Sequence, residues 1–327
     1  MTPRAKPPVW FERAILPELV SEVSASVTIL GPSTDVDPYA GLATAQAAVA
    51  STMRYDAVLM DQAPDLRLIA RTGIGYDLVD VAEATRRGIA VCNTPDAPTI
   101  STAEHAVALI LMVAKDVKRA EAQLRQGGGD HYARHEAIEL DGKTLGLVGL
   151  GRIARRVAGI CEGLGMRVTA FDPFLARTDG PPSVARAPTL ARLLGVADVV
   201  SLHVPLSDAT RAMFGAHQFA QMKPGAVFVN TARGGLVDGD ALLRALEVGH
   251  LFGAGLDVTE PEPLPADHPL LRRDDVVVTP HIASATAESK VRIFRAAFEQ
   301  VVQGLAGQRP DYLVNPDVWD GRTWPDT

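Results

Sequence analysis

The segment TLGLVGLGRIARRVAGICEGLGMRVTAFDP, residues 144–173, decides the fold. Its first apolar run, Leu145–Leu150, predicts a buried strand; a helical pattern begins near Arg152, and a second apolar run ends at Asp172. A strand, a glycine turn, a helix and a further strand make a βαβ unit, and such units build parallel sheets. The sequence therefore predicts an α/β protein with a doubly wound parallel sheet.

The turn in this segment reads Gly149-Leu150-Gly151-Arg152-Ile153-Ala154. The first glycine permits a tight turn, the second lets the backbone approach a pyrophosphate, and the small Ala154 allows close helix–strand packing. The helix N-terminus then offers N–H groups and partial positive charge to phosphates. Asp172 stands 21 residues after Gly151, near the offset of an acid that binds ribose. These features predict a dinucleotide site, against the simpler interpretation of Asp172-Pro173 as a plain turn.

Asp172 also predicts a preference for NAD over NADP, because a carboxylate repels a 2′-phosphate. The nearest arginine that follows it is Arg177. Two other glycine pairs, in 73–75 and 253–255, lack a following helix with an acid in place, so we do not expect dinucleotide loops there.

The same alternation of apolar runs and helical patterns extends along the chain, and a length of 327 residues suggests about two domains. Further strands are expected at 57–60, 66–72, 88–93, 198–205, 226–231, 252–258 and 276–280. One long helix is expected at 101–126, with a capping box at Ser101–Glu104 and its end at Gly127–Gly129.

Composition narrows the possible partners. A formal net charge of −7 and a sequence pI near 5.6 argue against a nucleic acid or an anionic membrane as partner. Two cysteines, Cys92 and Cys161, are too few for a disulfide framework or a cysteine zinc site, and no metal is expected. The N-terminus lacks an apolar leader and no run approaches a membrane span. We therefore expect a cytoplasmic location.

Three polar residues follow predicted strands, where open α/β sheets bind ligands. Arg233 follows the run at 226–231, Glu262 lies beyond the run at 252–258, and His281 follows the run at 276–280. Arginine can bind a carboxylate through two parallel hydrogen bonds, a carboxylate can orient an imidazole, and histidine can move the proton of an alcohol. Together they suit hydride transfer at a C–O centre, although each alone also fits a solvated loop.

These motifs resemble the D-isomer-specific 2-hydroxyacid dehydrogenase family, most closely its phosphoglycerate dehydrogenase and hydroxypyruvate or glyoxylate reductase branches. The resemblance runs from about Arg71 to Thr286, and its most specific blocks are ARGG (232–235), DVTEPEP (257–263) and TPHIAS (279–284). It implies two Rossmann-like domains, with an NAD domain (99–287) inserted into a flavodoxin-like substrate domain (1–98 and 288–327). It also implies NAD as cofactor, a small anionic 2-hydroxy or 2-oxo acid as substrate, and a homodimer.

The resemblance also implies roles for individual residues. Arg233, Glu262 and His281 match the substrate-binding arginine, the supporting glutamate and the acid/base histidine; Glu262 rather than Glu260 is the match, because it stands five residues after Asp257. The residues implied to bind or line NAD are Thr102, Gly149, Gly151, Arg152, Ile153, Asp172, His203, Val204, Pro205, Thr231, Ala232, Arg233, Asp257, His281 and Ser284. Those implied to bind substrate are Arg71, Gly73, Ile74, Gly75 and Arg233.

The chain departs from the family in carrying Leu78 after Asp77, where asparagine is common, which bears on hydrogen bonding in the substrate-side loop. No regulatory domain is expected after the catalytic region. Residues 127–135 are expected to form a loop that reaches toward a partner subunit, with His131 and His135 solvated rather than metal-bound.

Three alternatives stay open at this point. A non-catalytic, NAD-sensing scaffold like the family's transcriptional corepressors competes with the enzyme. Arg71 either pairs with a phosphate or second carboxylate of the substrate or forms a surface salt bridge. The apolar helix at 101–126 either meets a partner subunit or is buried within one subunit.

Overall fold

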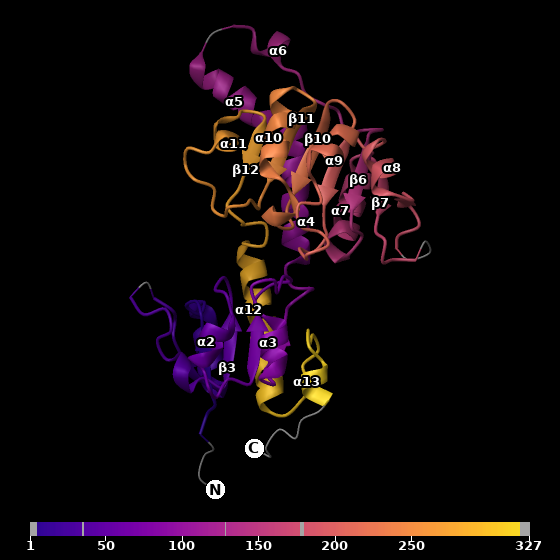
Figure 1. The fold of residues 1–327 in the computed structure, drawn as a ribbon. Coiled ribbons are helices and arrows are strands. Elements are labelled where there is room, and N and C mark those ends of the chain that lie inside the picture. The colour runs from indigo at the N-terminus through magenta and orange to yellow at the C-terminus, as the bar shows by residue number, and fades with distance from the viewer. Residues whose placement is uncertain (1–4, 35, 128, 177–179, 321–327) are drawn as a thin grey trace. The chain divides into compact units, whose positions relative to one another are not determined.

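The computed structural model describes residues 5–34, 36–127, 129–176 and 180–320 (Figure 1). The chain divides into two compact units. The first combines Met1–Pro98 with Ala287–Thr327, and the second is Thr99–Thr286. Ala287, which the sequence placed with the second unit, begins a helix of the first.

The first unit is built on a five-stranded parallel sheet in the order β2-β1-β3-β4-β5. Its strands are β1 (Pro8–Phe11), β2 (Thr28–Leu30), β3 (Ala47–Ala50), β4 (Leu68–Arg71) and β5 (Ala90–Cys92). Its helices are η1 (Pro17–Leu19), α1 (Val20–Ser26), η2 (Leu42–Thr44), α2 (Ala57–Asp61), α3 (Val81–Arg86), α12 (Ala287–Leu305) and α13 (Asp317–Asp320). This is a flavodoxin-like strand order, as the family resemblance implied for this domain.

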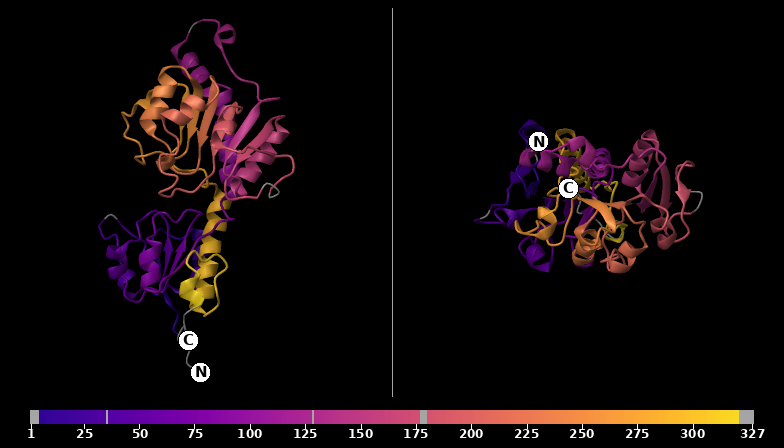
Figure 2. Two further views of the ribbon diagram at one scale, coloured as in Figure 1. Left: turned by 45° about the vertical axis from the view of Figure 1, so that its right-hand side comes forward. Right: turned by 90° about the horizontal axis from the view of Figure 1, so that it is seen from above.

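Helices cover both faces of this sheet. On one face α12 packs against β3 and β4 (Figure 2). Its Phe298 and Val301 join a buried cluster with Phe11 and Leu68. On the other face a second cluster gathers α2 side chains with alternate residues of the same strands, among them Ile69. Burial on both faces accounts for the continuous apolar runs that marked these strands in the sequence.

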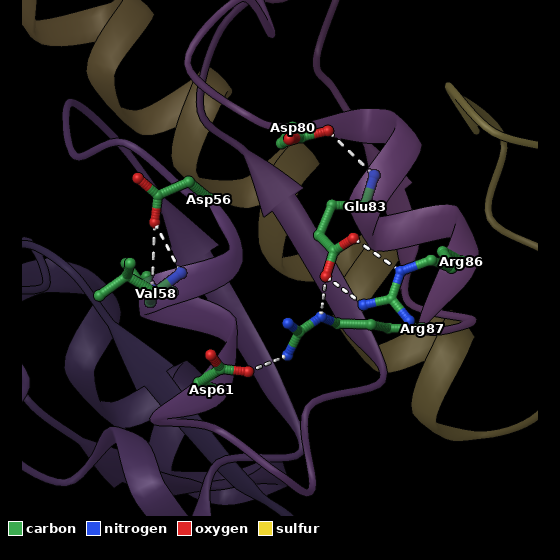
Figure 3. A network of polar contacts seen from close by, with 8 residues as sticks. Asp56, Val58, Asp61, Asp80, Glu83, Arg86 and Arg87 are labelled. Atoms are coloured by element: carbon green, nitrogen blue, oxygen red, sulfur yellow. Dashed lines mark hydrogen bonds and ion pairs between the residues drawn. The ribbon is translucent and has the colours of Figure 1, made fainter.

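The expected strand at 57–60 is wrong, because these residues form helix α2. The Asp56 side chain caps this helix by accepting the backbone N–H groups of Val58 and Leu59 (Figure 3). An aspartate at this position satisfies N–H groups that an apolar run alone would leave unpaired. The buried strand is instead β3 (Ala47–Ala50), an alanine-rich run whose weak β-propensity hid it.

A polar network joins α3 to α2 on the surface of this unit (Figure 3). Glu83 accepts hydrogen bonds from Arg86 and Arg87, and these bonds lower its pKa to about 2. Arg87 also donates to Asp61 at the end of α2, at 2.7 Å. The guanidinium of Arg87 therefore links the two helices.

The second unit is built on a seven-stranded parallel sheet in the order β12-β11-β10-β9-β6-β7-β8. Its strands are β6 (Thr144–Val148), β7 (Arg167–Phe171), β8 (Ala185–Arg186), β9 (Val199–Leu202), β10 (Ala226–Asn230), β11 (Leu251–Leu256) and β12 (Val276–Val278). Its helices are α4 (Thr99–Ala114), α5 (Val117–Gln126), α6 (His131–Arg134), α7 (Arg152–Gly163), α8 (Leu190–Leu194), α9 (Ala216–Gln221), η3 (Gly234–Leu236), α10 (Gly239–Glu247) and α11 (Pro269–Arg272). The doubly wound Rossmann-like order confirms the predicted fold class.

This sheet also carries a core on each face. In β10, Val227 and Val229 point into a cluster with α4 and α7, while Ala226 and Phe228 point into a cluster with α9 and α10. The alternation follows the period of two that a strand imposes on its side chains. Among the described residues, no helix combines the length and the hydropathy needed to cross a bilayer.

The single long helix expected at 101–126 is also wrong. Asp116 adopts φ +50, which separates the largely buried α4 from α5, a helix with no buried residue. The Ala114 carbonyl accepts the backbone N–H of Ile138 as the chain returns. The helix begins at Thr99, so the Ser101 hydroxyl lies inside it, where it hydrogen-bonds the Thr286 hydroxyl rather than capping the helix.

The segment at 127–135 is not loop throughout. It contains the short helix α6, whose N-terminus is capped by the Asp130 side chain through the Ala133 N–H. Gly128, expected to help end the long helix, lies outside the described residues. His131 and His135 are exposed.

Candidate active site

The second unit's sheet reverses its winding direction between β6 and β9. In such sheets ligands bind outside the carboxyl ends of the strands at this switch point. Gly149 follows β6 here with φ +87, and a Cβ on it would lie 2.7 Å from the carbonyl oxygen of His203, which follows β9. Glycine is therefore required both by the backbone angle and by the close approach of the two loops. The predicted residues Gly149, His203 and Val204 thus meet at the switch point, and Pro205 follows Val204 in the same loop.

The adjoining start of α7 has the character of a phosphate cradle. Gly151 is the N-cap residue and brings no capping side chain, and a Cβ on it would meet nothing within 4 Å. Arg152 and Ile153 form the first turn of the helix. Backbone N–H groups and open space at a helix N-terminus are what a pyrophosphate needs. These residues fit a dinucleotide.

Asp172 lies beside the same glycine turn. Its carboxylate accepts the backbone N–H of Leu150 at 3.0 Å and that of Phe174 at 3.0 Å, which ties the glycine turn to the end of β7. Arg186 of β8 donates to the Asp172 carbonyl oxygen. The sequence considered only Arg177 as a neighbouring cation, and that residue lies outside the described part of the chain. Arg186 lies near Asp172 because β8 pairs with β7, so their distance along the chain does not reveal this contact.

Burial sets the charge state of His203. Desolvation lowers its pKa to about 4, and its Nε2 lies 2.9 Å from the Ser201 hydroxyl. The imidazole is therefore neutral at ordinary pH. It adds no charge to the switch point.

The loop after β10 carries Arg233 and is held from beneath. The buried Asn230 side chain accepts the N–H of Ala232 at 3.0 Å and donates to the carbonyl of Arg233 at 2.8 Å. A Cβ on Gly234 would lie 2.0 Å from the carbonyl oxygen of Thr259, so only glycine lets this loop pass under the next one. The ARGG motif is thus a packing requirement as well as a source of an arginine.

Thr231 in the same loop is a buried polar group that calls for an explanation. Its hydroxyl has no hydrogen-bond partner among the described residues. Buried polar groups are nearly always satisfied, and an exception often marks a place where a ligand completes the bonding. This observation agrees with the predicted place of Thr231 beside a bound cofactor.

His281 and Glu262 form the central pair of the site. The Nδ1 of His281 lies 2.6 Å from Oε1 of Glu262, and both side chains are roughly two-fifths exposed. Glu260 turns elsewhere, toward Arg211 at 3.5 Å. The carboxylate fixes which ring nitrogen faces it, so Nε2 is the nitrogen that points away from Glu262.

The backbone of His281 is strained, with φ +54 in a residue other than glycine. Asp257, at the end of β11, holds it there. The carbonyl of Asp257 accepts the N–H of His281 at 2.7 Å, and its buried carboxylate accepts the N–H groups of Ile282 and Ala283 at 2.8 Å each. The histidine loop is therefore clamped around a single aspartate.

The Asp257 carboxylate has two further partners. Thr279 donates to it at 2.7 Å, and His105 of α4 lies 3.4 Å away. Burial alone would raise the pKa of Asp257, but these groups and the two loop amides hold it below its usual range. The resemblance implied a place for Asp257 along the cofactor, and that place stays a prediction.

The glycine loop of the first unit follows β4. The N–H of Gly73 donates to the Thr94 hydroxyl at 2.8 Å, and the Thr94 N–H returns a bond to the Gly73 carbonyl at 3.0 Å. Asn93 donates to the Ile74 carbonyl. Because the Gly73 donor is engaged within the protein, Ile74 and Gly75 carry the loop donors best suited to a ligand.

Arg71 lies at the end of β4 and is half-buried. Its guanidinium donates to the backbone carbonyl of Thr72 at 3.0 Å and to that of Ala50 at 3.5 Å. Two predicted residues remain. Thr102 lies in the first turns of α4 and is buried. Ser284 lies in the loop after β12 and is half-buried.

Sequence reasoning missed the residues that hold this site together: Asn230, His105, Thr279 and Thr94. Each acts through a side-chain hydrogen bond that the sequence alone does not reveal, although Thr279 lies within the TPHIAS block (279–284). Only the position of Thr279, two residues before His281, offered a signal.

The sequence of the second unit matches a known family. Residues 107–283 match D-isomer specific 2-hydroxyacid dehydrogenase, NAD binding domain. The D-3-phosphoglycerate dehydrogenase of Archaeoglobus fulgidus is 40% identical over 267 residues, which cover 82% of this chain and 50% of that protein. The glyoxylate reductase of Thermococcus litoralis is 37% identical over 326 residues, 97% of this chain and 89% of that protein. The chain thus spans about half the length of the first relative and most of the second.

A solved structure shows the same fold. D-lactate dehydrogenase from Aquifex aeolicus, complexed with NAD and lactic acid, is 31% identical with a TM-score of 0.82, and the match covers 94% of this chain and 98% of that one.

Proposed function

The chain belongs to the D-isomer specific 2-hydroxyacid dehydrogenase family, and from this premise we propose that it is an NAD-dependent oxidoreductase that transfers hydride between nicotinamide and C2 of a small 2-hydroxy or 2-oxo acid. Phosphoglycerate, hydroxypyruvate and glyoxylate define the substrate class. The observation that carries the proposal is the 2.6 Å pair of His281 and Glu262, on the loops that follow neighbouring strands of an NAD-binding sheet.

The roles of the side chains follow from their chemistry. NAD, when bound, supplies or accepts the hydride. His281 moves a proton to or from the substrate oxygen through Nε2, and Glu262 orients the ring and stabilises its charged form. Arg233 binds the substrate carboxylate, for which its planar fork is suited. Ile74 and Gly75 add backbone N–H donors.

The cofactor would be held by the switch-point residues of the second unit. The Gly149–Gly151 turn and Arg152 with Ile153 would bind the pyrophosphate, and Asp172 the adenine ribose. The loop after β9 (His203–Pro205) and the residues Thr102, Thr231, Ala232, Asp257 and Ser284 would surround the nucleoside and nicotinamide parts. The orphaned hydroxyl of Thr231 and the open space at Gly151 support this placement.

Three variants test the chemistry in an assay that follows NADH oxidation with glyoxylate, pyruvate, hydroxypyruvate and phosphohydroxypyruvate. His281→Ala should lower kcat by about 100-fold or more, the range for a general acid–base group, and leave the Kd for NADH nearly unchanged. Glu262→Gln should lower kcat as well, while Glu260→Gln, two residues away, should not. A near-normal kcat in His281→Ala would refute the assignment, and tight NADH binding without any turnover would indicate a scaffold instead.

A fourth variant tests the choice of cofactor. Asp172→Ala should raise the KM for NADH and reduce discrimination against NADPH, because it removes the charge that repels a 2′-phosphate. An unchanged ratio of kcat/KM for the two cofactors would contradict this role.

We also propose a homodimer in the cytoplasm. Apolar side chains are exposed on α5 and α6, with Leu124 67% and Tyr132 94% exposed, which suits a surface that a second copy covers. Both cysteines are buried free thiols, as a reducing compartment favours. Light scattering should report a dimer, and Leu124→Glu should convert it to a monomer; a monomeric wild-type protein would refute the dimer.

A further inference from the structure

Helix α4 crosses strand β11 over two glycines that the proposed cofactor site does not use. A Cβ on Gly255 would lie 2.8 Å from Cβ of Leu109, and a Cβ on Gly253 would lie 2.9 Å from Cγ1 of Val113. Glycine within a strand marks a place where another element approaches closely, and here that element is a helix. The glycine pair at 253–255 therefore has a packing role, because it seats α4 on the sheet.

The same register continues beyond the glycines, to the end of the strand. His105 stands four residues before Leu109 on α4, and Asp257 stands two residues after Gly255. Four helical residues rise about 6 Å and two strand residues about 6.6 Å, so the two elements stay in step. Nε2 of His105 accordingly lies 3.4 Å from Oδ1 of Asp257. The seating of α4 thus brings His105 to the aspartate that holds the loop of His281.

A chain of hydrogen bonds runs from His105 through Thr279 to Asp257. Thr279 donates its hydroxyl to Oδ1 of Asp257 at 2.7 Å, and Nε2 of His105 lies 2.9 Å from the same hydroxyl oxygen. A hydroxyl has one proton, and this one is directed at the carboxylate, so the oxygen can only accept from the histidine. Nε2 of His105 is therefore the ring nitrogen that carries the proton when the ring is neutral.

Asp257 transmits this restraint to the loop that carries His281. Its carboxylate accepts the N–H groups of Ile282 and Ala283 at 2.8 Å each, and its carbonyl accepts the N–H of His281 at 2.7 Å. The φ of +54 at His281 is a strained value that the surrounding contacts must maintain. Each contact that fixes Asp257 therefore also fixes the backbone of His281.

We propose that His105 is a positioning residue of the dehydrogenase: its Nε2–H holds the Thr279 hydroxyl toward Asp257 and so helps to keep His281 in its strained conformation. The proposal rests on the proposed function, because the position of His281 matters to turnover only if His281 moves the substrate's proton. All four residues belong to the second unit. Without the Nε2–H the Thr279 hydroxyl can rotate away from the carboxylate, and the loop is held less firmly.

Three substitutions of His105 separate hydrogen bonding from packing. His105→Gln places an amide NH2 near the position of Nε2, His105→Asn carries the same amide on a side chain one carbon shorter, and His105→Leu keeps bulk without a donor. The Asn and Leu variants should lower kcat for glyoxylate and hydroxypyruvate about 5- to 10-fold, with less change in the KM for NADH. The Gln variant should stay close to the wild type. Equal kcat values in the Gln and Asn variants would overturn the proposal, because the two differ only in the reach of the donor.

A double-mutant cycle tests the route through Thr279. Thr279→Val removes the hydroxyl, and Thr279→Ser keeps it. If His105 acts through this hydroxyl, His105→Leu should lower kcat no further in the Thr279→Val background, while in the Thr279→Ser background it should still lower kcat. Losses that multiply in the double variant of Leu and Val would overturn the route.

His250→Leu is the matched control. His250 directly precedes β11, at the opposite end of the strand from Asp257, and its Nε2 lies 3.1 Å from the Met222 carbonyl oxygen. The substitution removes one hydrogen bond of a half-buried histidine from the same strand. It should lower Tm and leave kcat intact. A His105→Leu enzyme that shows the same pattern, with lower Tm and wild-type kcat, would show that His105 serves stability alone and would overturn the proposal.

Nuclear magnetic resonance of the ring nitrogens tests the hydrogen-bond chain without an activity assay. At about pH 8.5, where a histidine of ordinary pKa is neutral, Nε2 of His105 should carry the proton, and its resonance should shift in Thr279→Val. A proton on Nδ1 instead would overturn the proposal, and because the tautomer is read from the wild type, this result holds even if the variants fail to fold. If the wild type reduces none of the 2-oxo acids, the proposed function itself fails and the inference with it. If the wild type is active and His105→Leu keeps its kcat, only the inference fails.

Discussion

Asp257→Asn is expected to damage both stability and catalysis, because one buried carboxylate holds the whole histidine loop. In the variant the side-chain oxygen can still accept the hydrogen bonds of Thr279 and Ile282. The NH2 group, however, would face the N–H of Ala283, which would lose its acceptor. One unsatisfied buried donor and two weakened bonds together cost about 3 kcal/mol. For a unit of this size that lowers Tm by about 6 to 12 °C.

The same change should lower kcat by about 10- to 100-fold, because small misplacements of a reacting group are costly. His281 sits at φ +54 only while its neighbours hold it there. Without the carboxylate the loop can relax, and Nε2 leaves its position. The KM for NADH should change less than kcat does.

The pH dependence of stability gives an independent signature. The pKa of Asp257 is lowered in the folded state, so its contribution is complete above the ordinary value of 3.8 and is lost as the pH falls below it. Tm of the wild type should therefore fall more steeply than that of Asp257→Asn below about pH 4, and the two curves should converge. Calorimetry over this range measures the difference.

Asp198→Asn is the matched control. Asp198 is a carboxylate of the same sheet whose pKa is also lowered: burial opposes ionisation, but the ion pair with Lys223 and the N–H of Thr144 outweigh it. It precedes β9 and therefore lies at the opposite edge from His281. Its loss should lower Tm and leave kcat intact. Equal loss of kcat in the two variants, or wild-type Tm and kcat in Asp257→Asn, would refute the clamp.

Three further predictions concern other parts of the molecule. Gly149→Ala should cost about 3 kcal/mol through its φ of +87 and the overlap with the His203 carbonyl, and should abolish tight NADH binding; calorimetric titration that finds wild-type affinity would contradict this. His203→Gln should make the free energy of unfolding less dependent on pH between pH 6.5 and 4. Because the folded-state pKa of His203 is about 4, the wild type loses at most about 3 kcal/mol of this free energy as the pH falls through this window. Arg87→Ala should lower Tm slightly by unlinking Glu83 from Asp61, and the difference should vanish in high salt; a salt-independent loss would point to packing instead.

Some of the site was predictable because its signal is local. The glycines of 149–151 and the acid at Asp172 are spaced by the geometry of one βαβ unit, so the sequence alone locates them. Arg233, Glu262 and His281 could be grouped because parallel strands bring their carboxyl ends to one edge. The choice of Glu262 over Glu260 came from the family resemblance, and the 2.6 Å contact with His281 agrees with it.

Other features were out of reach because the deciding contact lies far away in the sequence. The run at 57–60 is as apolar as a strand, and only the cap from Asp56 and the buried β3 beside it make it a helix. The end of α4 before Asp116 depends on Ile138, whose backbone N–H donates to the Ala114 carbonyl. Glu12 accepts the backbone N–H of Thr52, which stands about 40 residues further along the chain, and no local sequence pattern reveals that Glu12 is buried.

The two sheets treat the same topological feature in opposite ways. At the second unit's switch point, glycine at 151 leaves space and a helix N-terminus without a capping side chain, which is suited to an anion from outside the chain. At the first unit's switch point, the N–H groups of Ser51–Met53 already hold the chain's own anion, Glu12. These N–H groups are therefore satisfied within the chain, unlike those at the start of α7.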